Sequence, residues 1–151
     1  MSYTNPADTT VFHLINEYPA PPAPGAPYQL ILPDRYRHEI LSVAFQFITD
    51  TTVANRFVEV RLVGPIRNLA LSHTPAAHTA SAAYWYWFHR RTPQPLAAGF
   101  LNGNFFIPLF ADAILVGQGL LQISATNLQA GDQISDIAII RRVWHQPTFP
   151  T

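Results

Sequence analysis

The fold of this chain is indicated by residues 32–63, LPDRYRHEILSVAFQFITDTTVANRFVEVRLV, where two runs of alternating residues flank a short polar segment. The alternate apolar positions of the two runs are Leu41, Val43, Phe45 and Phe47, and then Val58, Val60 and Leu62. Alternation sends successive side chains to opposite faces of a strand. Because the polar residues Thr49–Thr52 connect the two runs, they predict a long antiparallel hairpin in a two-sheet sandwich.

Short apolar runs separated by Gly, Pro and Asn continue along the rest of the chain. We expect eight strands, at Tyr28–Leu32, Arg37–Ile48, Val53–Val63, Arg67–Ser72, Ala82–Arg90, Phe105–Phe110, Leu120–Ala125 and Ile134–Trp144. Residues 109–116 fit either a short helix or one more strand. In the last strand, residues 137–140 (IAII) are consecutively apolar, which indicates a middle buried on both faces. The fold class predicted is an all-β antiparallel β-sandwich, jelly-roll-like in its number of strands.

The first 27 residues differ from the rest. A short strand at Val11–Ile15 is compatible with the sequence, and five prolines follow between Pro19 and Pro27, which favour an extended polyproline conformation. We therefore expect an extended N-terminal arm at residues 1–27 and a sandwich domain at residues 28–151. The arm is either a leader draped over the surface or a segment that docks on a neighbouring subunit.

Charge is scarce in this chain of 151 residues. Charged residues make up 12% of it, against about 25% in a typical soluble domain, and the net charge is zero. Such a surface favours self-association, so we expect a homo-oligomer. All nine basic residues are Arg, which suits interface contacts, and the nine acidic residues leave no net positive field for nucleic acid. No run reaches the roughly 18 to 20 apolar residues that span a bilayer, so no membrane partner is expected.

One predicted strand, residues 83–90 (AYWYWFHR), is aromatic on both faces. Alternation sends Trp85 and Trp87 to one face and Tyr84, Tyr86 and Phe88 to the other. One face must join the core, and the other is covered by a subunit or left as a platform for sugar rings. We interpret it as core plus subunit interface. Together with the prolines and the paired arginines it supplies the interface candidates, which are Pro21, Pro22, Pro24, Tyr84, Trp85, Tyr86, Trp87, Phe88, Arg90, Arg91, Arg141 and Arg142.

Motifs for catalysis or metal binding are missing from the sequence. His73 and His78 are five residues apart, but Pro75 lies between them and the chain has no cysteine, so we expect loop histidines and no metal site. No nucleophile elbow, phosphate-binding loop or dinucleotide fingerprint is found. Asp50, Asp132 and Asp136 lie in or beside turns, where a carboxylate usually accepts backbone N–H groups. We therefore expect no enzyme activity and no cofactor.

Two segments resemble the small β-sandwich head decoration, or cement, proteins of tailed bacteriophages. They are residues 32–64, LPDRYRHEILSVAFQFITDTTVANRFVEVRLVG, and residues 124–143, SATNLQAGDQISDIAIIRRV, about a third of the chain. The resemblance implies a non-enzymatic virion protein, a homotrimer on the capsid surface that is made in the host cytoplasm and bound to the major capsid protein. Tail modules that bind glycans or receptors share the sandwich architecture, and such a module is the alternative.

Overall fold

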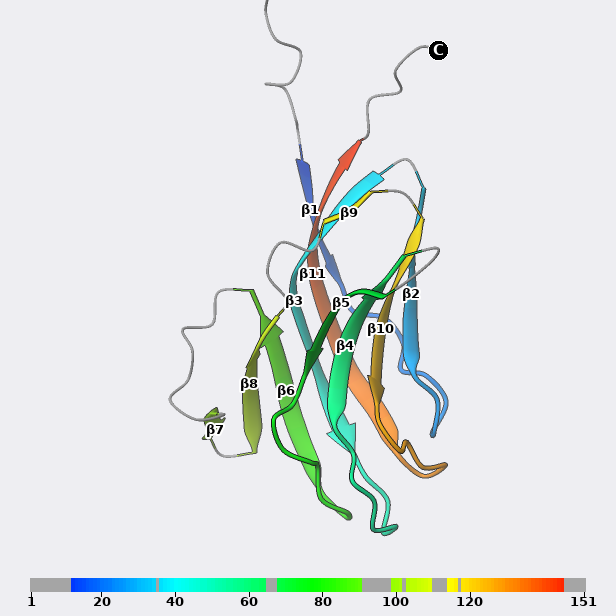
Figure 1. The fold of residues 1–151 in the computed structure, drawn as a ribbon, viewed down its shortest axis with the longest axis vertical. Coiled ribbons are helices and arrows are strands. Elements are labelled where there is room, and N and C mark those ends of the chain that lie inside the picture. Colours follow the sequence, from blue (N-terminus) through cyan, green and yellow to red (C-terminus); the bar gives the residue numbers. More distant parts are fainter. Residues whose placement is uncertain are drawn as a thin grey trace, which may run out of the picture.

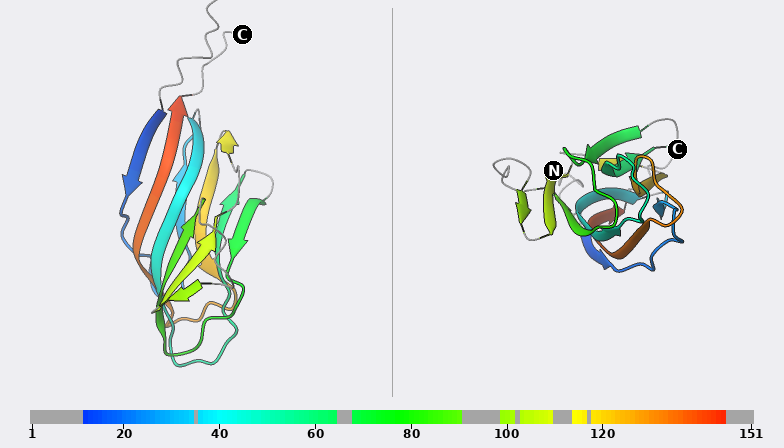
Figure 2. Two further views of the ribbon diagram at one scale, coloured as in Figure 1. Left: turned by 90° about the vertical axis from the view of Figure 1, so that its left-hand side faces the viewer. Right: turned by 90° about the horizontal axis from the view of Figure 1, so that it is seen from below.

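The computed structural model describes residues 12–34, 36–64, 68–90, 99–101, 103–109, 114–116 and 118–145, which form a two-layered, all-β sandwich (Figure 1). No helix long and apolar enough to cross a membrane occurs in this part of the chain. The long strands of the two sheets run side by side along the length of the molecule (Figure 2).

The larger sheet has the strand order β1-β11-β3-β6-β8-β7, and β9 pairs with one end of β3. Its strands are β1 (Phe12–Glu17), β3 (Tyr36–Ile48), β6 (Ala83–His89), β7 (Gly99–Leu101), β8 (Asn104–Pro108), β9 (Ile114–Val116) and β11 (Gln133–His145). The smaller sheet has the order β2-β10-β4-β5. Its strands are β2 (Tyr28–Leu32), β4 (Val58–Val63), β5 (Asn68–His73) and β10 (Gly119–Ala125). Pairing is antiparallel except between β6 and β8, which are parallel.

The core lies between the two sheets and is filled by the inward residues of both. The alternation read from the sequence is confirmed for most of β3 and β4: Val43, Phe45, Phe47, Val58, Val60 and Leu62 are all fully buried. Side chains from β6, β10 and β11 complete the same cluster. Burial of this apolar area is the main force that holds the two layers together.

The expected hairpin of residues 32–63 is wrong. β3 pairs with β11, β6 and β9, whereas β4 pairs with β10 and β5, so the chain crosses from one sheet to the other between them. The second strand is also shorter than expected, because Arg56 makes only an isolated bridge to His78 and the strand begins at Val58. Two strands in opposite sheets each bury the face that points into the core, and two strands paired in a hairpin of one sheet also bury one face each. Alternation therefore does not distinguish the two arrangements.

Two irregularities shift the alternation in β3 and β11. Their pairing changes register between Ser135 and Ala138 and again between Ile140 and Arg141. Opposite the second shift, Ile40 is buried and the expected core residue Leu41 is only half-buried. In β11 the core side takes Ile137 and Ile139, while Ile140 is 36% exposed. Within one chain residues 137–140 are thus buried on the core side only, because no other layer formed by the described residues of the same chain covers their outward side. Burial of that side by a neighbouring subunit stays a prediction.

Residues 12–27 belong to the sandwich in this structure. Phe12–Glu17 form the edge strand β1, which pairs with β11, and residues 18–27 connect β1 to β2 in the other sheet. The short strand expected at Val11–Ile15 is thus present with shifted bounds. The expected arm boundary at residue 27 does not separate these residues from the domain, and residues 1–11 lie outside the described part. Of residues 109–116, Ile114–Val116 form β9, and residues 110–113 also lie outside it.

Candidate interface on the larger sheet

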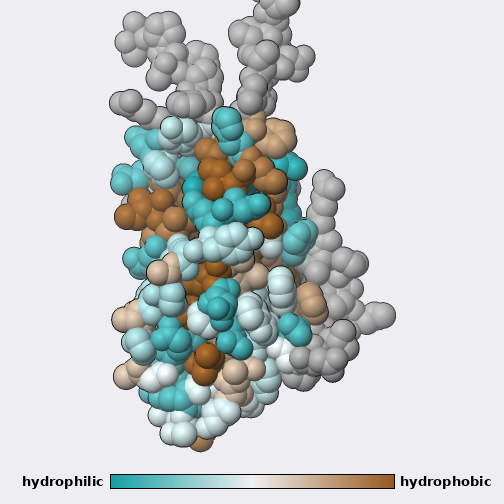
Figure 3. Space-filling model, turned by 180° about the vertical axis from the view of Figure 1, so that it is seen from behind, coloured by the Kyte–Doolittle hydropathy of each residue, from teal (hydrophilic) through white to brown (hydrophobic). Residues whose placement is uncertain are grey.

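The outward face of the larger sheet carries many apolar side chains. The most exposed of them are Phe12, Leu14, Ile48, Trp87, Phe106 and Ile140. Figure 3 shows this side of the molecule, on which brown apolar patches lie between teal polar ones. Apolar side chains gathered on one face are typical of a surface that contacts another molecule.

The aromatic strand β6 divides its side chains between the core and the outside, as alternation predicted. Tyr86 and Phe88 are buried and stack on Phe45, with ring centroids 5.7 and 5.9 Å apart. Tyr84 lies on the same side, partly buried, and packs edge-on against Phe105 at 5.5 Å. These three interface candidates therefore contribute to the core side of the sheet. Tyr86 and Phe88 are inaccessible to a partner of the folded chain.

Trp85 and Trp87 lie on the outward side of β6. Their ring centroids are 5.9 Å apart, and Phe106 of the neighbouring strand β8 stacks beyond Trp87 at 6.4 Å. The indole N–H of Trp87 donates to Asn104 Oδ1 at 3.1 Å. Stacking and this hydrogen bond fix the orientation of the row, so it presents a preformed aromatic surface.

A groove of about 530 Å³ runs beside this row. It is lined by Tyr18, Pro19, Pro21, Ala44, Trp85, Trp87 and residues 135–138. Ala44 and Ala138 are paired across β3 and β11, and Ala44 is also paired with Trp87. The small side chains of this row make the floor, the tryptophans make one wall, and the proline-rich connection makes the other. A hollow of this volume and composition suits an apolar ligand.

The β-bulge of β11 lies at one end of the groove. Asp136 has a φ of 48°, a left-handed conformation that few residues other than glycine adopt. The Ser135 hydroxyl lies 3.2 Å from Asp136 Oδ2 and 3.5 Å from Gln46 Oε1. The bulge thus turns a hydroxyl and a carboxylate towards the outside at this end, as bulges near binding sites often do.

The proline candidates lie in the connection between β1 and β2. Pro21 lines the groove, the Pro22 carbonyl accepts a hydrogen bond from Gln133 Nε2 at 3.0 Å, and Pro24 is exposed. Gly25 has a φ of 73°, and its N–H donates to the Asp132 carbonyl at 2.7 Å. The connection is therefore fixed against the sandwich by its own backbone.

The arginine candidates are engaged within the chain. Arg90 forms an ion pair with Glu39, whose other oxygen lies 3.4 Å from Arg142 Nη1. The Arg142 guanidinium also lies over the Phe12 ring, 5.1 Å from its centroid. Arg91 lies outside the described residues. Arg90 and Arg142 are therefore engaged within the chain, and aromatic and apolar side chains are the main groups that this face offers to a partner.

Arg141 points inward, unlike Arg142. It forms an ion pair with Glu17 at 2.7 Å, which attaches β1 to β11, and its Nη1 lies 2.9 Å from His38 Nδ1. His38 Nε2 lies 3.2 Å from the Pro33 carbonyl, so Nε2 carries the hydrogen and Nδ1 accepts from Arg141. Burial lowers the pKa of His38, and Arg141 lowers it further, while the Pro33 carbonyl opposes the change. The imidazole is thus held neutral.

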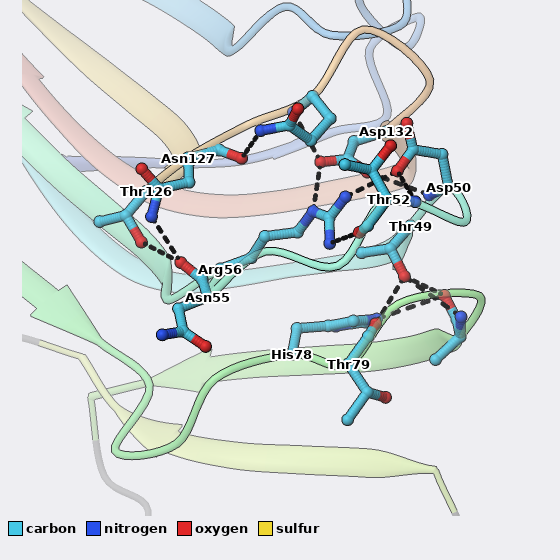
Figure 4. A network of polar contacts seen from close by, with 12 residues as sticks. Thr49, Asp50, Thr52, Asn55, Arg56, His78, Thr79, Thr126, Asn127 and Asp132 are labelled. Carbon is cyan, nitrogen blue, oxygen red and sulfur yellow. Dashed lines mark hydrogen bonds and ion pairs between the residues drawn. The ribbon is translucent and has the colours of Figure 1, made fainter.

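A second polar cluster, the Arg56 network, joins the connections at one end of the sandwich (Figure 4). Arg56 is fully buried and pairs with Asp132 at 2.6 Å and with Asp50 at 2.7 Å, and it also donates to the Thr52 carbonyl. Burial alone would raise the pKa of Asp132, but hydrogen bonds from Arg56 and from the N–H groups of Gln129 and Asp50 hold it below its usual value. The network fixes the β3–β4 and β10–β11 connections to each other.

The sequence predicted part of this network. Asp50 and Asp132 were expected to accept backbone N–H groups in turns, and they do: Asp50 accepts from Thr52 and Asp132 from Asp50, both at 3.0 Å. Arg56 was missed. The signal in the sequence is that Arg56 is in phase with the core positions Val58 and Val60 of the expected strand Val53–Val63, so its cation requires a buried partner.

His73 and His78, the two histidines considered in the sequence analysis, lie in different environments. His78 is buried, with Nδ1 2.6 Å from the Tyr86 hydroxyl and Nε2 3.2 Å from the Ala82 carbonyl, and burial lowers its pKa. His73 is exposed, with Nδ1 2.9 Å from the Thr74 carbonyl. Across the described ranges, no three His, Asp or Glu side chains gather closely enough to hold a metal ion.

Comparisons with known proteins found no relative of this chain. No protein-family model matches the chain, and neither the search of curated proteins nor the search of solved structures returned a significant match.

Proposed function

We propose that this protein is a non-enzymatic structural protein of a bacteriophage virion, a decoration or cement protein that stabilises the head shell as a symmetric oligomer. The observation that carries the proposal is the outward face of the larger sheet, where Leu14 is 56% and Trp87 39% exposed in a chain with few charges. Such a face is better suited to permanent contacts than to free solvent.

The strand order supports a finer assignment of the fold, which we propose to be a jelly roll. Four strands in the order β1-β11-β3-β6 face four in the order β2-β10-β4-β5. Successive strands change sheets at the β1–β2, β2–β3, β3–β4, β5–β6, β9–β10 and β10–β11 connections. Viral capsid domains are among the proteins built on a double sheet of this kind, as are lectins.

The mechanism proposed is mass action. A trimer that binds the assembled shell of major capsid protein, and not its separated subunits, stabilises the shell by its binding free energy. The protein would be made in the host cytoplasm and would act on the capsid surface. No reaction, cofactor or metal is required for this activity.

Two matched substitutions test whether the larger sheet carries the contacts. Leu14→Glu places a charge on its outward face, and Ile31→Glu places one on an exposed edge strand of the smaller sheet, where Ile31 is 71% exposed. Sedimentation equilibrium should show a trimer for the wild type and for Ile31→Glu, and smaller species for Leu14→Glu. The copy number in purified particles should approach that of the shell protein. A monomeric wild type, or a copy number typical of a tail, would contradict the proposal.

A tail-associated glycan-binding module is the second candidate. The exposed row of Trp85, Trp87 and Phe106 favours it, because flat aromatic rings stack on sugars. In that case Trp87→Ala should abolish retention on an oligosaccharide while the oligomer persists. Loss of the oligomer without any oligosaccharide binding would exclude this candidate.

A further inference from the structure

The lining of the groove restricts the ligand that it suits. Most of its lining is apolar. The polar groups among it are the Tyr18 hydroxyl, the Trp85 N–H and the Trp87 N–H, which is already donated to Asn104, with the Ser135 hydroxyl beside Asp136 at one end. A sugar chain brings many hydroxyls, each of which costs free energy if it is buried without a partner. A proline-containing segment has no N–H at its prolines and leaves fewer groups unpaired. Aromatic-lined grooves bind such segments in the polyproline conformation.

We propose that the groove binds residues 146–151, QPTFPT, of a second copy of the chain. The segment contains Pro147 and Pro150 on either side of Phe149, and it has no charged side chain. It would lie as an extended polyproline segment over Ala44 and Ala138, with its prolines against Trp85 and Trp87. This inference rests on the proposed homo-oligomer and names the contact that joins its subunits.

Other proline segments fit the groove less well. Pro19 and Pro21 already form one of its walls. Residues 92–95, TPQP, directly follow two arginines, of which Arg90 is already paired with Glu39, and they would bring surplus positive charge to a lining that is mostly uncharged among the described residues. Residues 146–151 match its apolar, nearly uncharged lining best.

The donor must be another subunit. β11 runs from Gln133 to His145, and the groove lies at its beginning, from Ser135 to Ala138. Seven residues separate Ala138 from His145, about 23 Å at the strand rise of about 3.3 Å per residue. Six extended residues span at most about 20 Å, so residues 146–151 cannot turn back and fill the groove of their own copy. When residues 146–151 of one copy bind to another copy, the groove is filled and the segment has a binding site within its reach.

Complementation between two full-length variants tests this inference. Ala138→Gln fills the floor of the groove, and the double substitution Pro147→Ala with Pro150→Ala alters the donor segment. Each alone should weaken association by about tenfold or more, the effect of losing about 1.4 kcal/mol. An equimolar mixture should form a dimer, because one partner keeps its groove and the other its segment. Ala83→Gln, on the same face outside the groove, is the matched control and should associate normally.

A heptapeptide of residues 145–151, added in excess to the wild-type protein, should dissociate the oligomer and change the tryptophan emission. The same peptide with both prolines replaced by alanine should do neither, and cellohexaose should have no effect. Circular dichroism melts establish that each variant is folded. An oligomer insensitive to both variants and to the peptide would overturn this inference alone. A monomeric wild type would overturn the homo-oligomer as well, and quenching by cellohexaose but not by the peptide would assign the groove to a saccharide.

Discussion

The Arg56 network and the outward face of the larger sheet use polar and apolar residues in opposite ways. The network buries Arg56 and Asp132 almost completely, while the face leaves Trp87 39% exposed. Among the described residues, the buried charged side chains are Glu39, Arg56, Glu59, Asp132 and Arg141. The surface therefore has even less charge than the composition indicates. The chain thus uses buried charges to fix its connections and leaves aromatic rings on its surface.

The buried ion pairs of this chain fix geometry more than they add stability. Desolvation offsets much of the attraction within a buried pair, but removing one partner leaves the other charge buried alone. Arg56 spans two connections that cross between the sheets, and Arg141 attaches the edge strand β1 through Glu17. Each pair joins segments that are far apart in the sequence.

The largest effect is expected from Arg56→Ala. The substitution leaves the Asp132 carboxylate buried without its cation, which should lower the free energy of unfolding by about 3–5 kcal/mol. Arg142→Ala is the control, because Arg142 is partly exposed and Glu39 keeps Arg90 as a partner, so the cost should be about 1 kcal/mol or less. Urea denaturation measures both. Equal costs would mean that the network is no more important than a surface ion pair.

A matched pair of substitutions should distinguish the core face of β6 from its outward face. Phe88→Ala opens a cavity in the core and should cost about 3–5 kcal/mol at every protein concentration. Trp87→Ala removes an outward ring and should cost about 1 kcal/mol or less in dilute solution. It should also abolish the concentration dependence of the melting temperature, which reports association. If Trp87→Ala destabilised the dilute protein as much as Phe88→Ala does, the outward face would be part of the fold.

A smaller effect is expected from Gly131→Ala at the loop end. A Cβ at this position would lie 2.8 Å from Cβ of Asp50 and 2.9 Å from its Oδ2. The β3–β4 and β10–β11 connections would have to separate, at a cost of about 1–3 kcal/mol. In Gly64→Ala the new Cβ would meet the side chain of Leu69 at 3.2 Å, which has rotamer freedom, so the loss should be less. Thermal melts compare the two, and a greater loss for Gly64→Ala would contradict the close approach.

The smallest change is expected from pH. Burial lowers the pKa of His38 and His78 below the usual 6.5, so near and below that value the unfolded chain binds protons that the folded chain excludes. Stability should be complete above about pH 6.5 and should fall as the pH drops through that value. Urea midpoints between about pH 8 and about pH 5 measure the slope. A stability that rises towards acid would disprove neutral buried histidines.

Much of the fold could be predicted from the sequence. Alternation located most of the strands and sorted their faces, because a strand with one buried face needs apolar residues at every second position. The division of Trp85 and Trp87 from Tyr86 and Phe88 was found in the same way, although alternation did not say which set was core. The edge strand β1 was indicated only in part, and the short strands β7 and β9 carried too few residues for a pattern.

The sequence by itself therefore determined the class of fold, the faces of its main strands and the scarcity of surface charge. Only the tertiary structure decided that β3 and β4 lie in opposite sheets, that a bulge at Asp136 opens one end of a groove, and that Arg56 meets Asp132 across 76 positions of the chain. The physical reason is that alternation is a local property of each strand. Pairing, bulges and buried ion pairs depend on which distant segments share one core, and that is fixed only when the two sheets pack together.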